Sequence, residues 1–292
     1  MPPQQPTAGD ASGHPMPIRL GHSPDSDDAF MFYGLAEHKV PTEGFEFEHI
    51  LRDIETLNHW ATEGRLEITA ISVHAYAYVA DKYAILTHGA SMGDNYGPMV
   101  VTREPASIEW LREQRIAIPG TMTSAYLALR LFLGNDFAYD IVPFDHIMEA
   151  VHSGTASAGL LIHEGQLTHG ELGLHKVVDL GEWWFQETAG LPLPLGVNAV
   201  RRDVGAERMT ALSRVLKASI AYGLDHRAPA LQHAMQYARG LSVATADQFV
   251  GMYVNAWTLD MGPRGEESIR LFLQRAHEAG VIASAVPVDF VA

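Results

Sequence analysis

Short apolar segments alternate with polar turns along the first two thirds of the chain, and a helical pattern follows most of them. Segment 45–51 alternates apolar and polar residues with a period of two, which is typical of a half-buried strand. The other expected strands are short apolar runs, at 17–21, 66–71, 99–102, 115–118, 138–143, 158–162 and 195–200. Residues 204–279 are helical in pattern. Strands that alternate with helices predict an α/β fold.

Four corners between a strand and the next helix carry small polar residues or histidine, at 22–28, 72, 119–124 and 163. Two corners precede the strand at 99–102, and two follow it. Because ligands bind at the carboxyl ends of strands in open α/β sheets, we expect the corners to face a cleft between two lobes. The expected units are a disordered lead-in at 1–16, a discontinuous lobe at 17–98 plus 201–292, and a second lobe at 99–200.

His163 ends the apolar run 158–162 and is followed by an acid and a glycine. At the carboxyl end of a buried strand, an imidazole lies where ligands bind, and it titrates near neutral pH. His163 is therefore the candidate proton acceptor. The alternative is a hydrogen-bonded core histidine, since the chain contains 15 histidines.

Hydroxyl groups cluster at the start of the apolar helix expected at 125–134. Thr121, Thr123 and Ser124 lie there beside the free amides of the first helical turn. Because one cap needs only one hydroxyl, we expect a site for a carboxylate at this corner, with capping alone as the alternative.

Two earlier corners have the same character. Ser23, Asp25 or Asp27 could cap the helix that follows 22–28, and Ser72 could cap the helix expected at 73–80. The dipole of such a helix would direct its positive end toward whatever lies beyond the strand. Capping and ligand binding both remain open interpretations for these side chains.

The charge of the chain limits its partners. The 292 residues carry a formal net charge of −15 and only 20 Lys and Arg residues. We therefore expect no nucleic-acid partner, whereas a small anion held by local amides and hydroxyls is compatible with this charge.

No segment has the apolar length of a membrane span or the composition of an export signal. We expect a cytoplasmic protein without a membrane partner.

Two partial motifs for metal binding are incomplete. His163 begins the zinc motif H-E-x-x-H, but Leu167 replaces its second histidine. The aspartates in 22–28 begin like a calcium loop, but Phe30 occupies the place of the turn glycine. The chain also contains no cysteine. We therefore expect neither a metal nor a cofactor.

Several longer motifs resemble those of one enzyme family. They are RLGHSP (19–24), ILRDIETLNHWATEGRL (50–66), ISVHAYAYV (71–79), IPGTMTSAY (118–126), GLLIHEGQLTHGELGLHKVVDLGEWW (159–184), TAGLPLPLG (188–196) and MYVNAWTLDMG (252–262). In these motifs the chain resembles the 1,4-dihydroxy-6-naphthoate synthase family of the futalosine route to menaquinone, from about residue 18 to the C-terminus. The resemblance implies a two-lobed fold of the periplasmic-binding-protein type II kind, with the ligand cleft between the lobes.

The resemblance also implies a reaction. Members of this family are lyases that cleave a carbon–carbon bond of cyclic dehypoxanthinyl futalosine to leave 1,4-dihydroxy-6-naphthoate, so the expected partner is a small-molecule carboxylate. The family's base is the histidine of L-I-I-H-E, which matches His163, and its substrate contacts match Ser72, Thr123 and Ser124. A neutral imidazole would remove a carbon-bound proton next to a carbonyl.

The first loop departs from the family pattern S-P-C-P-N-D-T-F, because it reads SPDSDDAF at 23–30. Asp27 replaces an amide, and Asp25 is an additional acid. We expect Ser23 and Asp27 to contact the substrate. Negative charge here would disfavour a substrate carboxylate, so either the carboxylate binds at 121–124 or the substrate differs.

Two other functions are compatible with the sequence. A non-catalytic solute-binding protein for small anions can have the same fold, although such a receptor normally carries an export signal. Chorismate dehydratase, the sister enzyme of the same pathway, is disfavoured because the quoted motifs match the naphthoate synthase.

Overall fold

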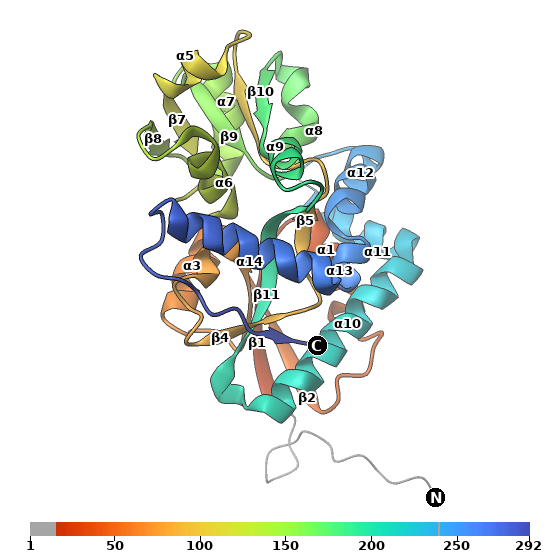
Figure 1. The fold of residues 1–292 in the computed structure, drawn as a ribbon. Helices are drawn as coiled ribbons and strands as arrows, with labels where there is room; N and C mark the ends of the chain where they lie inside the picture. The colour runs from red at the N-terminus through yellow and green to blue at the C-terminus, as the bar shows by residue number, and fades with distance from the viewer. Residues whose placement is uncertain (1–15, 239) are drawn as a thin grey trace, which may run out of the picture.

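The computed structural model describes residues 16–238 and 240–292, which form two lobes, one above the other in Figure 1. Each lobe is built on its own mixed sheet. The fold is thus the two-lobed α/β arrangement that the resemblance implied. The disordered lead-in expected at 1–16 lies outside the described residues, except for Met16, where the first strand begins.

The larger sheet lies in the lower lobe and has the strand order β12-β4-β11-β3-β1-β2, with β5 paired to β11. Its strands are β1 (Met16–His22), β2 (Phe45–Leu51), β3 (Ile68–Ser72), β4 (Tyr83–Leu86), β5 (Ser91–Gly93), β11 (Leu193–Arg201) and β12 (Phe290–Val291). Strand β1 is parallel to β2 and β3, whereas β11 is antiparallel to β3, β4 and β5. Because β1 and β3 are parallel neighbours, the corners that follow them share one edge of the sheet.

The smaller sheet has the strand order β10-β6-β9-β7-β8. Its strands are β6 (Met99–Thr102), β7 (Arg115–Ile118), β8 (Ala138–Ile141), β9 (Ala158–Leu161) and β10 (His175–Asp179). Strand β9 is parallel to β7, so the corner at 119–124 and His163 also share an edge.

Helices cover both sheets (Figure 1). The larger lobe contains α1 (Ser26–Met31), α2 (Tyr33–Ala36), α3 (Ile54–Thr62), α4 (Val73–Tyr76), α10 (Ala206–Asp225), α11 (Arg227–Ala234), α12 (Val243–Tyr253), α13 (Ala256–Leu259) and α14 (Gly262–Glu278). The smaller lobe contains α5 (Ile108–Arg112), α6 (Ser124–Leu133), α7 (Ile147–His152), α8 (Gly165–Thr168) and α9 (Leu180–Glu187). Short 3-10 helices lie at η1 (Phe144–His146), η2 (His169–Leu172), η3 (Arg202–Val204) and η4 (Met235–Tyr237). No helix in the described ranges combines the length and apolar character needed to cross a membrane.

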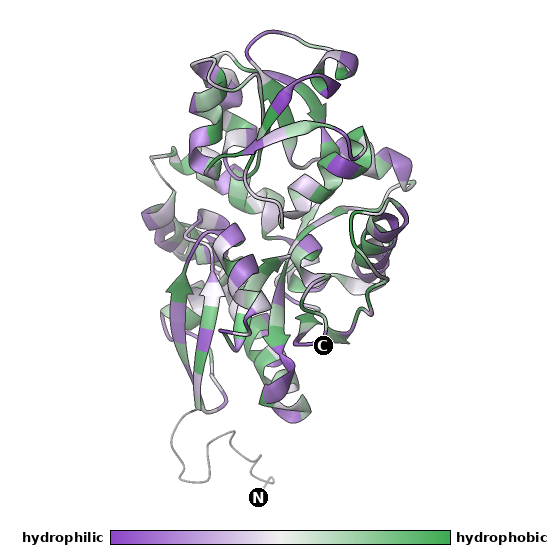
Figure 2. Ribbon diagram, turned by 90° about the vertical axis from the view of Figure 1, so that its left-hand side faces the viewer, coloured by the Kyte–Doolittle hydropathy of each residue, from purple (hydrophilic) through white to green (hydrophobic). Residues whose placement is uncertain are grey.

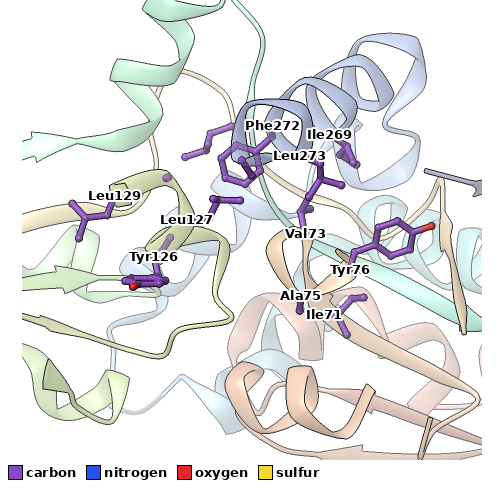
Figure 3. Packing of buried hydrophobic residues seen from close by; sticks show 14 of the residues in the cluster. Ile71, Val73, Ala75, Tyr76, Tyr126, Leu127, Leu129, Ile269, Phe272 and Leu273 are labelled. Atoms are coloured by element: carbon purple, nitrogen blue, oxygen red, sulfur yellow. The ribbon is translucent and has the colours of Figure 1, made fainter. Parts of the chain in front are cut away.

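One buried apolar cluster spans both lobes, and further clusters lie within each lobe. Figure 2 shows hydrophobic residues concentrated on the strands and hydrophilic residues on outward-facing parts of the helices. Between the lobes, Leu127 of α6 belongs to the same buried cluster as Val73 of α4 and Phe272 of α14 (Figure 3). Burial of such side chains contributes about 1.5–3 kcal/mol each, so this packing holds α6 against the larger lobe.

The sheets divide the chain differently from the boundary expected at residue 200. Strand β11 pairs with β3, β4 and β5, so 193–200 belongs to the larger sheet rather than to the second lobe. The pattern of an apolar strand does not reveal which sheet it joins, because either sheet buries it equally well. Strand β5 of the same sheet also pairs with β11.

Three buried histidines are neutral in the folded protein and make its stability depend on pH. Burial lowers the pKa of His22 to about 3, and it lowers those of His49 and His74 to about 4. Unfolding returns each pKa to its ordinary value of 6.5. Their contribution to the free energy of unfolding is therefore complete above that pH and is lost as the pH falls toward the folded-state pKa, with a slope of at most about 1.4 kcal/mol per pH unit for each group.

The variant His22→Gln isolates one of these contributions. Asp28 acts with the opposite sign, because burial raises its pKa to about 6 and acidification then stabilises the fold. Urea unfolding at about pH 7 and about pH 5 should show that the stability difference between the parent protein and the variant shrinks on acidification. A difference that is constant with pH would contradict a neutral His22.

Candidate active site

A cavity of about 120 Å³ lies between the lobes and is lined by residues of both. Its polar lining residues are Ser23, Asp27, Asp28, Ser72, Ser91, Asn198 and Tyr253 from the larger lobe, and Thr123, Ser124, His163 and Gln166 from the smaller lobe. Of the expected site residues, Thr121 does not line it. Helix α6 begins at Ser124, so Thr121 lies in the partly exposed turn before the helix.

His163 follows β9 and is held at the cavity in an unusual conformation. Its φ of 60° lies in the left-handed region, which few residues other than glycine adopt. The ring packs edge-on against Phe144, with the ring centroids 4.5 Å apart. Within the described part of the chain, Nε2 is buried without a hydrogen-bond partner. His163 is thus not a core histidine with both nitrogens satisfied, and its strained backbone is typical of functional sites.

The other ring nitrogen of His163 meets a residue of the opposite lobe. Nδ1 lies 3.2 Å from Oδ2 of Asp25, whose side chain is 1% exposed. The same carboxylate oxygen accepts a hydrogen bond from Ser23 Oγ at 2.7 Å. Asp25 stands at the N-cap position of α1, but its side chain makes no capping bond there. Its carboxylate is directed to the serine and the imidazole instead of to the helix amides.

The first loop gathers carboxyl groups that cannot all be ionised. Burial raises the pKa of Asp27 well above its usual range, and repulsion from Asp28, Asp25 and Glu164 adds to the effect. Burial also raises the pKa of Asp28 to about 6, although the Ser23 amide donates to its Oδ2 at 2.7 Å. A protonated Asp27 can donate a hydrogen bond. The loop therefore carries less negative charge than its three aspartates suggest.

The hydroxyls at the start of α6 are engaged within the protein. Thr123 Oγ1 caps the helix by accepting from the Tyr126 amide at 3.2 Å, and it donates to the Gly120 carbonyl at 2.9 Å. Ser124 Oγ donates to the Leu195 carbonyl at 2.5 Å. Capping is therefore present at this corner, as the alternative interpretation held. With the Tyr126 amide taken by this cap, the amides that precede it in the first turn are the donors left for an anion.

Ser72 lies across the cavity and is positioned by Asn58 of α3. The Asn58 side chain donates to Ser72 Oγ at 3.1 Å and accepts from the Ser72 amide at 2.8 Å. The hydroxyl proton of Ser72 is thus available to a ligand, because its oxygen already serves as an acceptor. Nowhere in the described ranges is a group of three or more histidine and acidic side chains placed to hold a metal ion.

The family model described as menaquinone biosynthesis matches residues 18–278, a span that includes every residue lining the cavity. The chain belongs to the menaquinone biosynthesis family. This membership places it among enzymes of menaquinone biosynthesis.

Two curated members of the menaquinone biosynthesis family are similar over most of the chain. The 1,4-dihydroxy-6-naphthoate synthase of Thermus thermophilus is 41% identical over 91% of this chain and 96% of its own. The enzyme of the same name from Streptomyces coelicolor is 36% identical over 92% of this chain and 96% of its own. These identities extend across both lobes.

Solved structures agree with this fold. A crystal structure of a protein from Archaeoglobus fulgidus superposes with a TM-score of 0.88 at 44% identity, covering 94% of this chain and 100% of that one. The alkanesulfonate-binding protein of Xanthomonas axonopodis superposes with a TM-score of 0.69 at 11% identity, covering 94% and 97%. The second likeness shows only that the menaquinone biosynthesis family shares the periplasmic-binding-protein fold.

Five polar lining residues were not among the expected site residues: Asp28, Ser91, Asn198, Tyr253 and Gln166. Asn198 of β11 donates to the Gly89 carbonyl at 3.3 Å, while its Oδ1 is buried without a partner in the described residues. Tyr253 of α12 donates to Gln166 Oε1 at 2.6 Å, which joins the two lobes. Gln166 follows His163 closely in a quoted motif, but no local signal indicates that it meets a residue of the C-terminal helices.

The bond between Tyr253 and Gln166 is expected to favour the closed arrangement of the lobes. Tyr253→Phe removes this bond and keeps the ring, which packs on Phe249 with centroids 5.2 Å apart. We expect the variant to bind substrate roughly 5-fold more weakly, the equivalent of about 1 kcal/mol for one neutral hydrogen bond. Calorimetric titration measures this change. An unaltered affinity would indicate that this bond contributes nothing to closure.

Proposed function

We propose that this enzyme converts cyclic dehypoxanthinyl futalosine to 1,4-dihydroxy-6-naphthoate by breaking a carbon–carbon bond, with His163 as the general base. The observation that carries the proposal is the environment of the imidazole. Nδ1 lies against a carboxylate, while Nε2 is buried at the cavity without a partner among the described residues. A neutral imidazole in this environment accepts a proton at Nε2. The names of the two curated relatives support the choice of substrate.

The first step is proton transfer from carbon to nitrogen. Nε2 of His163 takes a carbon-bound proton next to a substrate carbonyl, and the electron pair of that bond moves toward the carbonyl oxygen. The resulting imidazolium lies beside Asp25, which compensates its charge. The electron pair then returns from the carbonyl oxygen to form a ring double bond as the carbon–carbon bond breaks. The pair of the broken bond leaves with the departing fragment, which takes the proton from the imidazolium, and formation of the aromatic naphthoate ring favours the products.

Asp27 is suited to stabilise the oxygen on which negative charge develops. Burial raises its pKa, which favours the protonated form, and its Oδ1 is buried without a partner within the described ranges. A neutral carboxyl in an apolar site donates a strong hydrogen bond to an oxyanion, as a protonated aspartate does in ketosteroid isomerase. The aspartate that replaces the family's amide at this position is thus compatible with the family substrate.

The substrate carboxylate is assigned to the start of α6. Thr123 and Ser124 line the cavity there, and the first amides of the helix have no partner within the helix. Ser72 lines the cavity from the larger lobe and offers a hydroxyl proton, while Ser23 lies beside Asp25. The carboxylate is therefore kept apart from the acidic loop.

A turnover assay tests this function. The purified protein is incubated with cyclic dehypoxanthinyl futalosine, and 1,4-dihydroxy-6-naphthoate is followed by liquid chromatography and mass spectrometry. We expect product in large excess over enzyme. Tight binding without product would indicate a solute-binding protein, and conversion of chorismate instead would indicate a dehydratase. Either outcome would overturn the proposed reaction.

A further inference from the structure

The imidazole of His163 and the carboxylate of Asp25 come from different lobes and meet at the cavity. His163 follows β9 of the smaller sheet, and Asp25 follows β1 of the larger sheet. Nδ1 and Oδ2 are 3.2 Å apart, and both side chains are largely buried, at 16% and 1% exposure. This contact therefore joins the two lobes.

A neutral imidazole carries one N–H, and its position decides whether the ring can act as a base at the substrate. A carboxylate accepts hydrogen bonds and does not donate them, so a carboxylate at Nδ1 places the proton on that atom. The lone pair then lies on Nε2, the nitrogen that is buried at the cavity without a partner in the described residues. The opposite tautomer would present an N–H to the substrate and could not accept a proton there.

We infer that Asp25 is the positioning residue of the base His163. The inference rests on the proposed function, because it assigns a role within that reaction. Asp25 accepts the Nδ1 proton, fixes the tautomer and then compensates the imidazolium that forms when Nε2 takes the substrate proton. Asp25 accepts only the hydrogen bond and takes no proton from the ring, so no second proton transfer is needed.

The surroundings of both side chains restrict their movement. Ser23 Oγ donates to the same Asp25 oxygen at 2.7 Å, which fixes the orientation of the carboxylate. Phe144 packs against the ring of His163, whose backbone lies in the left-handed region. A strained residue held by its neighbours is typical of preorganised sites. The side chain of Asp25 makes no capping hydrogen bond to α1, although the residue occupies the N-cap position.

Nitrogen-15 NMR of the histidine-labelled protein tests the tautomer without any substrate. The His163 signals are assigned by their loss in His163→Gln. We expect the parent protein to carry the proton on Nδ1 near neutral pH and Asp25→Asn to shift it to Nε2, since the asparagine amide can donate to Nδ1. A proton on Nε2 in the parent protein would overturn the inference, whatever the variant does.

Kinetics provide the second measurement. Asp25→Asn should lower kcat by about 10²–10⁴-fold with little change in KM, because binding contacts remain and the base is in the wrong tautomer. Asp140→Asn, an exposed aspartate on β8, is the matched control and should leave kcat unchanged. Circular dichroism checks that the variants fold. Unchanged kcat in Asp25→Asn would also overturn the inference.

If the parent protein shows no turnover of cyclic dehypoxanthinyl futalosine, the proposed function fails, while the NMR result still decides the role of Asp25 toward His163.

Discussion

Replacement of His163 by alanine is expected to lower kcat by about 10²–10⁴-fold, the usual contribution of a general base, while the fold persists. Alanine removes the buried Nε2 and leaves no proton acceptor at that point of the cavity. The backbone of residue 163 lies in the left-handed region, which asparagine tolerates better than alanine. His163→Asn is therefore the companion variant, since it lacks the base and disturbs the backbone least.

A histidine outside the cavity provides the control for this experiment. His175 is exposed at the start of β10, so His175→Ala should retain the parent kcat. Circular dichroism and thermal unfolding establish that all three variants are folded. Turnover near the parent level in a folded His163→Ala protein would remove His163 from the mechanism and point to another acceptor in the cavity.

The position of His163 could be predicted because its signal is local. An apolar run that ends on histidine places that residue at the carboxyl end of a strand, and β9 does end at Leu161, two residues before it. Strands β6 and β7 have the bounds expected from their apolar runs for the same reason. Each of these features depends only on neighbouring residues, which the sequence displays directly.

The contact between His163 and Asp25 could not be predicted, because it depends on how the two lobes meet. The sequence around Asp25 indicates a helix cap, and a cap is indeed where the residue stands. Only the packed structure shows that its carboxylate meets the imidazole instead. The bond from Tyr253 to Gln166 likewise joins a C-terminal helix to the smaller lobe. Contacts of this kind follow from the apolar packing between the lobes. No single segment of the sequence indicates how that packing is arranged.

The hydroxyls at the start of α6 illustrate a case between these two. Their position at a helix N-terminus was predicted, and α6 does begin at Ser124. The sequence left their use open between capping and ligand binding. Thr123 Oγ1 in fact accepts from the Tyr126 amide as a cap, while Ser124 Oγ donates to the Leu195 carbonyl of β11, a contact that was not predicted. A hydroxyl satisfies a backbone group as readily as a ligand, so the residue type alone does not distinguish the two uses.

Two substitutions of Asp27 are expected to distinguish a neutral acid from an ionised carboxylate. Asparagine has a similar size and still offers a donor, so Asp27→Asn should keep kcat within a few-fold of the parent value. Leucine has no donor, so Asp27→Leu should lower kcat by about 10²–10³-fold, the usual cost of losing one group that stabilises an oxyanion. Steady-state kinetics measure both variants. Comparing the two variants separates the effect on kcat of losing the hydrogen-bond donor from the effect of changing the side-chain volume.

The pH dependence of kcat provides an independent measurement on the same residue. Burial and the neighbouring Asp28, Asp25 and Glu164 raise the pKa of Asp27, so the parent enzyme holds the donor below that raised pKa and loses it as the pH rises through it. We expect kcat of the parent to decline on the alkaline side and Asp27→Asn to lack that decline, because an amide does not titrate. If Asp27→Asn were instead as damaging as Asp27→Leu, Asp27 would act as an ionised acceptor. The substrate group that it meets would then be a hydroxyl rather than a developing oxyanion.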